Sequence, residues 1–155
     1  MSAPTQFRKY LITGASGYVG GRLVRTLADE KFDIRILVRD RKKAIGQPWA
    51  QAVEICEGSA ENRSDFDAAL AGVHTAYYLL HSINLGRNFQ EIEAEMARNF
   101  AQAAEAAGVA QIVYLGGIAN DVNISKHLAS RVRTGIELAS TSVPVMELRA
   151  GIIIG

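Results

Sequence analysis

The sequence predicts an α/β fold, a doubly wound parallel sheet of about six strands in the order 3-2-1-4-5-6 with helices on both faces. Two observations predict the parallel sheet with helices on both faces, and the strand order is the usual one for this fold class. Short β-branched runs alternate with longer amphipathic stretches, and the strand segments LIT, IRILV, VEI, YYLL and IVYL are almost continuously apolar. Strands buried on both faces have this composition, whereas an antiparallel sheet with one wet face alternates between apolar and polar residues.

Each element follows from the local pattern. We expect strands at 9–13, 33–38, 53–57, 75–80, 111–115 and 145–148, and helices at 18–30, 41–45, 62–71, 89–107 and 126–140. The fourth helix has the clearest signal, because Phe89, Ile92, Met96 and Phe100 recur at intervals of three or four residues and form one apolar stripe. We interpret that stripe as a core-facing surface.

Composition indicates one domain over residues 1–155. The chain has 17 Lys and Arg against 16 Asp and Glu, a net charge of +1, which argues against a nucleic-acid partner. Cys56 is the single cysteine, so there is no internal disulfide, and no short-spaced ligand motif predicts a metal site. No apolar run approaches the length of a membrane span. We therefore expect a cytoplasmic domain without a membrane partner.

The strongest motif follows the first strand. Three glycines at three-residue spacing lead into the first helix, where they permit a sharp turn, a close backbone approach to a diphosphate, and tight packing of helix on strand. The N-terminus of that helix offers free N–H groups to phosphate. The expected cofactor-binding loop consists of Gly14, Ala15, Ser16, Gly17, Tyr18, Val19 and Gly20.

The end of the second strand indicates which cofactor binds. An acidic residue there accepts hydrogen bonds from both ribose hydroxyls of NAD, whereas the 2′-phosphate of NADP needs a cation. Arg39 stands at this place and is followed by Asp40 and further basic residues. NADP(H) is therefore favoured, with Arg39 as a fork to the 2′-phosphate, and Asp40 leaves NAD(H) open. A solvated basic helix start is the alternative interpretation.

The motif TGASGYVG resembles the extended and atypical short-chain dehydrogenase/reductases. The segments YYLLHS at 77–82, YLGG at 114–117, HLASR at 127–131 and ELRA at 147–150 resemble the atypical NAD(P)H-binding group known as nucleoside-diphosphate-sugar epimerase-like. The resemblance implies a Rossmann fold, adenine contacts at Ser59 and Ala60, and a nicotinamide half passing over Leu80 and His81. The resembling families usually have Asp at the position of Ser59.

The catalytic pair of these reductases is altered. They use a Tyr-x-x-x-Lys pair on the helix after the fifth strand, and here His127 and Arg131 occupy the two places with the spacing kept. A neutral His127 can accept a proton, and Arg131 can bind a ribose hydroxyl or a phosphate. The usual active-site serine is missing, because Gly116 and Gly117 fill that turn.

Two functions stay open. One is an NADP(H)-dependent oxidoreductase or epimerase-like enzyme acting on an unknown small molecule, supported by the retained spacing. The other is a dinucleotide-sensing or scaffold protein, supported by the lost Tyr, Lys and Ser. Extended reductases build substrate recognition mainly after the sixth strand, so we expect that region to be absent from this chain. The resemblance also allows a homodimer that pairs the helices at 89–107 and 126–140.

Overall fold

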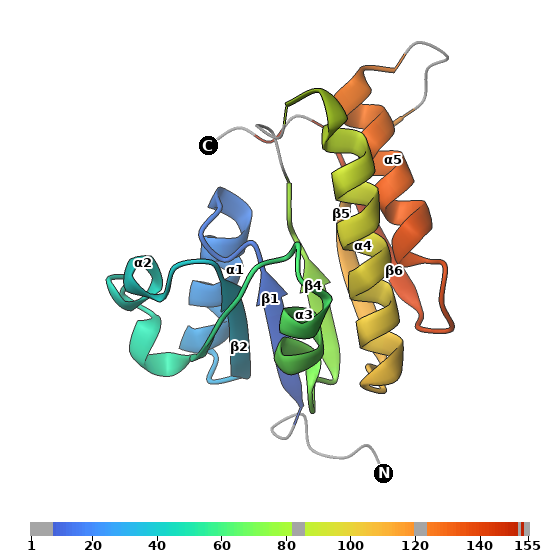
Figure 1. Ribbon diagram of the computed structural model, residues 1–155. Helices are drawn as coiled ribbons and strands as arrows, with labels where there is room; N and C mark the ends of the chain where they lie inside the picture. Colours follow the sequence, from blue (N-terminus) through green and yellow to red (C-terminus); the bar gives the residue numbers. More distant parts are fainter. Residues whose placement is uncertain (1–7, 82–85, 120–123, 152, 154–155) are drawn as a thin grey trace.

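The computed structural model describes residues 8–81, 86–119, 124–151 and 153. Within these residues, six strands form one sheet in the order β3-β2-β1-β4-β5-β6, and every pair of neighbours is parallel (Figure 1). The predicted fold class and strand order are therefore confirmed. The order reverses between β1 and β4, which is where a doubly wound sheet opens a crevice for a ligand.

The elements lie close to their predicted positions. The strands are β1 (Lys9–Thr13), β2 (Asp33–Val38), β3 (Glu54–Glu57), β4 (Thr75–Tyr78), β5 (Gln111–Gly117) and β6 (Val145–Ala150). The helices are α1 (Tyr18–Asp29), α2 (Arg41–Ile45), α3 (Arg63–Leu70), α4 (Phe89–Ala106) and α5 (Lys126–Leu138), with short 3-10 turns η2 (Ala50–Ala52) and η3 (Gly86–Asn88).

Three predicted strand ends are wrong by two residues. β4 ends at Tyr78 instead of residue 80, whereas β5 and β6 each extend two residues further than predicted. Leu79 and Leu80 are predicted in the strand because they are apolar, but apolar composition does not show where strand pairing ends. β5 and β6 continue because they pair with each other as far as Gly117 and Ala150.

Side chains on the two faces of the sheet build two separate cores. Leu11 on β1 packs with the side of the sheet that carries α3, α4 and α5, where Phe66 and Phe100 contact each other edge to face at 5.1 Å. Its neighbour Ile12 packs with Val24 of α1 on the opposite side. Adjacent strand residues point to opposite faces, so both faces of the sheet are buried.

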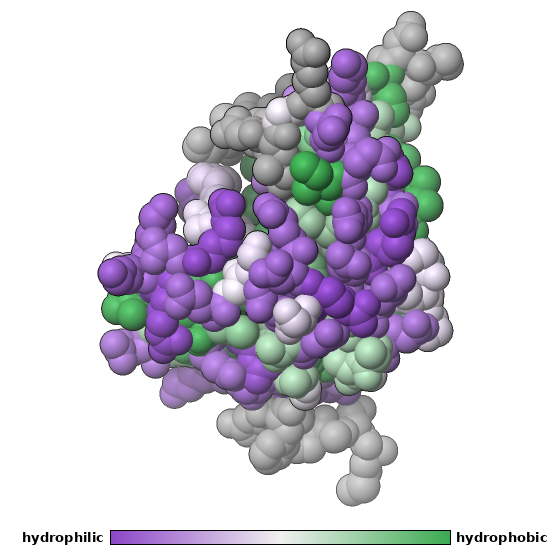
Figure 2. Space-filling view, in the orientation of Figure 1, coloured by the Kyte–Doolittle hydropathy of each residue, from purple (hydrophilic) through white to green (hydrophobic). Residues whose placement is uncertain are grey.

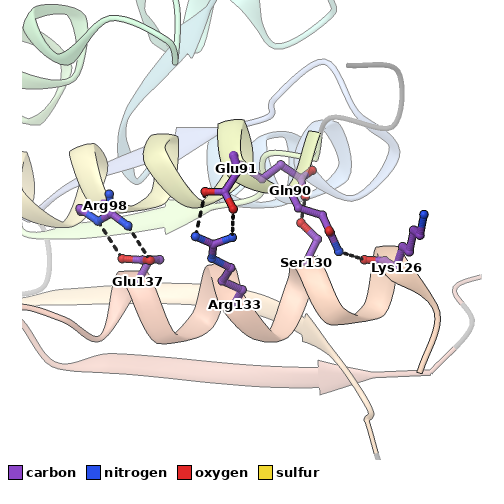
Figure 3. A network of polar contacts seen from close by, with 8 residues as sticks. Gln90, Glu91, Arg98, Lys126, Ser130, Arg133 and Glu137 are labelled. Atoms are coloured by element: carbon purple, nitrogen blue, oxygen red, sulfur yellow. Dashed lines mark hydrogen bonds and ion pairs between the residues drawn. The ribbon is translucent and has the colours of Figure 1, made fainter. Parts of the chain in front are cut away.

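Helices α4 and α5 are held together by polar contacts as well as by the core. Arg133 makes two hydrogen bonds to the Glu91 carboxylate, and Arg98 makes two to Glu137 (Figure 3). These hydrogen bonds lower the pKa of both carboxyl groups below their ordinary values. The molecular face in Figure 2 is largely hydrophilic. In the described part of the chain, no helix is long and apolar enough to span a membrane.

Contacts between backbones fix the turn between β1 and α1. Gly14 has a φ of +71°, and a side chain there would place its Cβ 2.5 Å from the carbonyl oxygen of Leu79. A Cβ on Gly20 would lie 2.7 Å from the carbonyl carbon of Gly14 and 3.1 Å from the Cα of Ala15. The first turn of α1 therefore lies directly against the turn that precedes it.

We expect Gly20→Ala to lower the free energy of unfolding by about 1–3 kcal/mol, because the new methyl group must push backbone apart. Chemical denaturation measures the change. Gly46→Ala is the matched control, since its Cβ would come no closer than 4.0 Å to other atoms and its φ of −74° suits any residue. Equal stability of the two variants would contradict the close approach described here.

Candidate functional site

The loop after β1 presents backbone donors at the switch point of the sheet. Its turn is closed by the N–H of Gly17, which donates to the carbonyl oxygen of Gly14 at 3.0 Å. Gly17 is also the N-cap of α1 and supplies no capping side chain, and the first turn of α1 contains no acidic residue. The first N–H groups of a helix lack partners within that helix. This end of α1 is therefore suited to bind an anion.

Thr13 joins the two strands on either side of the switch point. Its buried hydroxyl donates to the carbonyl oxygen of Tyr77 at 2.9 Å and accepts from the N–H of Leu79 at 3.1 Å. These bonds hold the chain after β4 beside the glycine turn. Sequence reasoning missed this role, although a threonine that ends a buried apolar strand is a signal that a hydroxyl is needed there.

An open pocket of about 530 Å³ lies between the glycine loop and the end of β2. It brings together the predicted residues Ala15, Ser16, Gly17 and Arg39. The pocket also has lining residues that sequence reasoning did not assign to the site: Gly21, Val38, Asp40, Lys43, Ala44, Gln47 and Trp49. The loop and the predicted cofactor selector thus share one cavity.

Helix α2 places a second cation beside Arg39. Asp40 is the N-cap of α2, and its side chain accepts a hydrogen bond from the N–H of Lys42 at 2.9 Å. The helix then carries Lys43 to the pocket. Among the described residues, neither Arg39 nor Lys43 forms an ion pair within 4.0 Å. The two pocket cations, Arg39 and Lys43, are thus not paired with a carboxylate of the described residues. Asp40, the acidic residue of the pocket, caps α2 instead.

A second hollow of about 500 Å³ adjoins this pocket and shares Gly21, Gln47 and Trp49 with it. The predicted residue Tyr18 lines this hollow instead of the first pocket. Tyr18 is 48% exposed, and its ring lies under the Arg22 guanidinium, 4.2 Å from the ring centroid. Val19 and Gly20 complete the first turn of α1 and line neither cavity.

Ser59 and Ala60 form a turn after β3 and are not among the residues that line the two cavities. The Ser59 hydroxyl accepts from the N–H of Glu61 at 3.2 Å, while the N–H of Ser59 donates to Asp65 at 2.9 Å. This backbone hydrogen bond is the main reason that the pKa of Asp65 lies below its ordinary value. The carboxylate missing from position 59 is thus present nearby, supplied by α3.

The predicted catalytic pair splits between two environments. The His127 ring is exposed and stacks on Phe89 with 4.9 Å between ring centroids. Arg131 instead reaches toward the end of β4, where its Nη2 lies 2.7 Å from Nε2 of His81. The structure therefore brings Arg131 and His81 together. Leu80, which precedes His81 in the chain, is half-buried.

Gly116 and Gly117 lie within β5, and the ends of neighbouring side chains occupy the space that a serine there would use. A Cβ on Gly117 would lie 2.6 Å from Cδ1 of Leu128, and a Cβ on Gly116 would meet the carboxyl group of Glu147, with the carboxyl carbon at 3.2 Å. Side chains from α5 and β6 fill this space. In the described parts of the chain, no group of three His, Cys, Asp or Glu residues is placed to hold a metal ion.

Comparison with known proteins gives the family. Residues 7–133 match the NmrA-like family. The ceramide reductase of Caulobacter vibrioides is 29% identical over 136 residues, which are 86% of this chain and 42% of that protein. The 3-beta-hydroxysteroid dehydrogenase of Mycolicibacterium neoaurum is 29% identical over 121 residues, 71% of this chain and 32% of that protein. The chain spans less than half the length of these two relatives.

Solved structures share the fold. The Citrobacter sp. triphenylmethane reductase in complex with NADP(H) has a TM-score of 0.76 and 25% identity, over 91% of this chain and 48% of that one. A nucleoside-diphosphate-sugar epimerase from Staphylococcus aureus has a TM-score of 0.78 and 22% identity, over 91% and 50%. A short-chain dehydrogenase/reductase superfamily protein from Agrobacterium tumefaciens with bound NAD has a TM-score of 0.74 and 18% identity, over 92% and 48%.

The match to the family extends over most of the chain, and the sheet has the strand order of the Rossmann fold with a phosphate-type glycine turn at its switch point. The predicted resemblance to atypical short-chain reductases is therefore confirmed. We conclude that this chain belongs to the NmrA-like family and is a dinucleotide-binding domain.

Proposed function

We propose that this chain is the cofactor-binding domain of an NADP(H)-dependent reductase. The observation that carries the proposal is the pair of cations, Arg39 and Lys43, in the pocket beside the glycine loop. A diphosphate at the N-terminus of α1 directs the adenosine half of a dinucleotide toward the end of β2. Arg39 and Lys43 then meet the 2′-phosphate, which NADP has and NAD lacks.

The position of Asp40 supports the same preference. A carboxylate that selects NAD must be free to accept hydrogen bonds from both ribose hydroxyls. Asp40 lines the pocket, but one of its oxygens already accepts from the N–H of Lys42. The basic residues after Asp40 have different contacts. Arg41 donates to the carbonyl oxygen of Ile55 at 2.8 Å, whereas Lys43 lines the pocket.

The relatives support reduction as the chemistry. One curated relative is a ceramide reductase, and a structural neighbour, the triphenylmethane reductase, was solved with NADP(H). Because the chain covers less than half of these proteins, substrate recognition by a region outside residues 1–155 is part of the proposal. We also propose that the protein forms a homodimer in which α4 and α5 pair with the same helices of a second copy.

A second function is favoured by the altered catalytic pair. His127 stacks on Phe89, Arg131 bonds His81, and Gly117 has no side chain where reductases use a serine. A protein that binds NADP(H) and responds to it without hydride transfer fits these three features. The two functions share the cofactor pocket and differ only in turnover.

We expect Arg39→Gln and Lys43→Gln each to weaken NADPH binding by about 10- to 100-fold, since each removes a hydrogen bond between charged groups. NADH binding should stay within about twofold, because NADH lacks the phosphate. Isothermal titration calorimetry measures both. Lys42→Gln is the matched control, an exposed lysine of the same helix that does not line the pocket. Equal losses for NADPH and NADH would contradict the selector.

Gly17→Asp tests the diphosphate site by itself. An aspartate at an N-cap stabilises a helix, and the φ of −81° and ψ of 170° suit it. Its carboxylate would occupy the place where the diphosphate binds. A Cβ at position 17 would lie 3.3 Å from the carbonyl oxygen of Gly14, a tight contact that offsets the capping gain, so we expect little change in thermal stability together with at least a tenfold loss of affinity for NADPH and NADH alike. Normal cofactor binding by this variant would show that the diphosphate lies elsewhere.

Turnover separates the two functions. We expect oxidation of NADPH, followed by its absorbance with a panel of carbonyl compounds, to be lost in His127→Ala while NADPH affinity stays within about twofold. His74→Ala is the control, since its Nδ1 lies 2.9 Å from Thr75 Oγ1, near the start of β4 and away from the cofactor edge. Tight NADPH binding without oxidation of any compound would favour the sensing function.

A further inference from the structure

Arg131 lies at the edge of the sheet where doubly wound folds bind ligands. Arg131 extends from α5 to the ends of β4 and β5, and a Cβ built on Gly117 would lie 3.7 Å from its Cδ and 3.8 Å from its Nη1. The side chain thus runs along the last residue of β5, at the carboxyl edge of the sheet. Its backbone carbonyl oxygen accepts from the Tyr114 hydroxyl at 2.8 Å, which fixes the helix at this turn.

The partner of this guanidinium is an imidazole that stays neutral. Nη2 of Arg131 lies 2.7 Å from Nε2 of His81, and because a guanidinium only donates, Nε2 must accept and the ring proton must sit on Nδ1. Although His81 is an exposed residue, desolvation of the ring, and after it the Arg131 charge, lower the pKa of His81 to about 4, with Glu93 acting in the opposite direction. Near neutral pH the contact therefore orients Arg131 without neutralising it.

Arg98 and Arg133, the other arginines of α4 and α5, differ from Arg131 because each is paired with a carboxylate. Arg133 bonds the Glu91 carboxylate at 2.6 Å and Arg98 bonds Glu137 at 2.7 Å, and the pairs lie along the α4–α5 surface (Figure 3). Within the described ranges, no carboxylate lies in an ion pair with Arg131 at 4.0 Å or less. A half-buried arginine that is oriented, and that has no carboxylate partner among the described residues, is suited to bind an anion that is not part of this chain.

We propose that Arg131, oriented by His81, binds an oxyanion, either a carboxylate or a phosphate, at the ends of β4 and β5. Neighbouring strands are about 4.8 Å apart, so β5 lies about 10 Å from β1 and the site is separate from the diphosphate site of the glycine loop. Only the source of the oxyanion rests on the proposed function. It is an acidic group of the substrate if NADP(H) leaves Arg131 free, and a phosphate of the cofactor if it does not.

The His81 ring is a reporter for this site. We expect the NMR titration of its ring protons to move to higher pH by about one unit when inorganic phosphate saturates the chain, because a bound anion offsets the Arg131 charge. In Arg131→Gln, the His81 titration should start at higher pH and no longer respond to phosphate. Arg133→Gln is the matched control, since it removes an arginine of the same helix and should leave the response intact.

Variants of His81 test its positioning role. With the Gly117 amide resonance as the probe, His81→Ala should weaken phosphate binding by about tenfold, and His81→Gln, whose amide oxygen still accepts a hydrogen bond, should recover most of it. Equal losses in both variants would overturn the positioning role.

Repeating the His81 titration with NADP⁺ identifies the source of the oxyanion. A response to phosphate that persists in the NADP⁺-saturated chain indicates a substrate group, and a response produced by NADP⁺ itself indicates the cofactor. If NADP⁺ fails to bind while phosphate still shifts His81, the proposed function fails and the oxyanion site stands. No shift of the His81 titration with phosphate or NADP⁺ would overturn the site.

Discussion

The close approach of α1 to the turn after β1 is the constraint on which the rest of the site depends. Gly20 lets the helix lie against Gly14, and Gly14 in turn lies against the backbone after β4. Thr13 completes this contact with hydrogen bonds to Tyr77 and Leu79. Because these close contacts fix the turn, the N–H groups of α1 are held at the switch point of the sheet, where a diphosphate can bind.

Electrostatics divides the molecule into two kinds of surface. Between α4 and α5, Arg98 and Arg133 are each paired with a carboxylate of the neighbouring helix, so these two charges join the two elements. Along the carboxyl edge of the sheet, Arg39 and Arg131 have no such carboxylate among the described residues. Exposed ion pairs contribute little to stability, and cations left unpaired at a ligand-binding edge are better explained by recognition than by folding.

The altered catalytic positions follow from packing as much as from sequence. Leu128 and Arg131 of α5 fill the space in which a side chain on Gly117 would stand. Arg131, at the position where the resembling reductases have lysine, has an acceptor in His81 at the end of β4. The changes at these positions fit one another, which argues for a rearranged site built around a fixed guanidinium.

The sequence by itself determined the fold class and the glycine turn, because these depend on apolar periodicity and on backbone freedom that only glycine has, and the strand order followed from the fold class. It did not place Lys43 beside Arg39, Asp65 beside Ser59, or His81 beside Arg131. Each of these pairs joins residues from different elements, and their separation is set by how a helix packs on the sheet. Only the tertiary structure decided which charges stay unpaired, since pairing is a property of distance and spacing along the chain does not encode it.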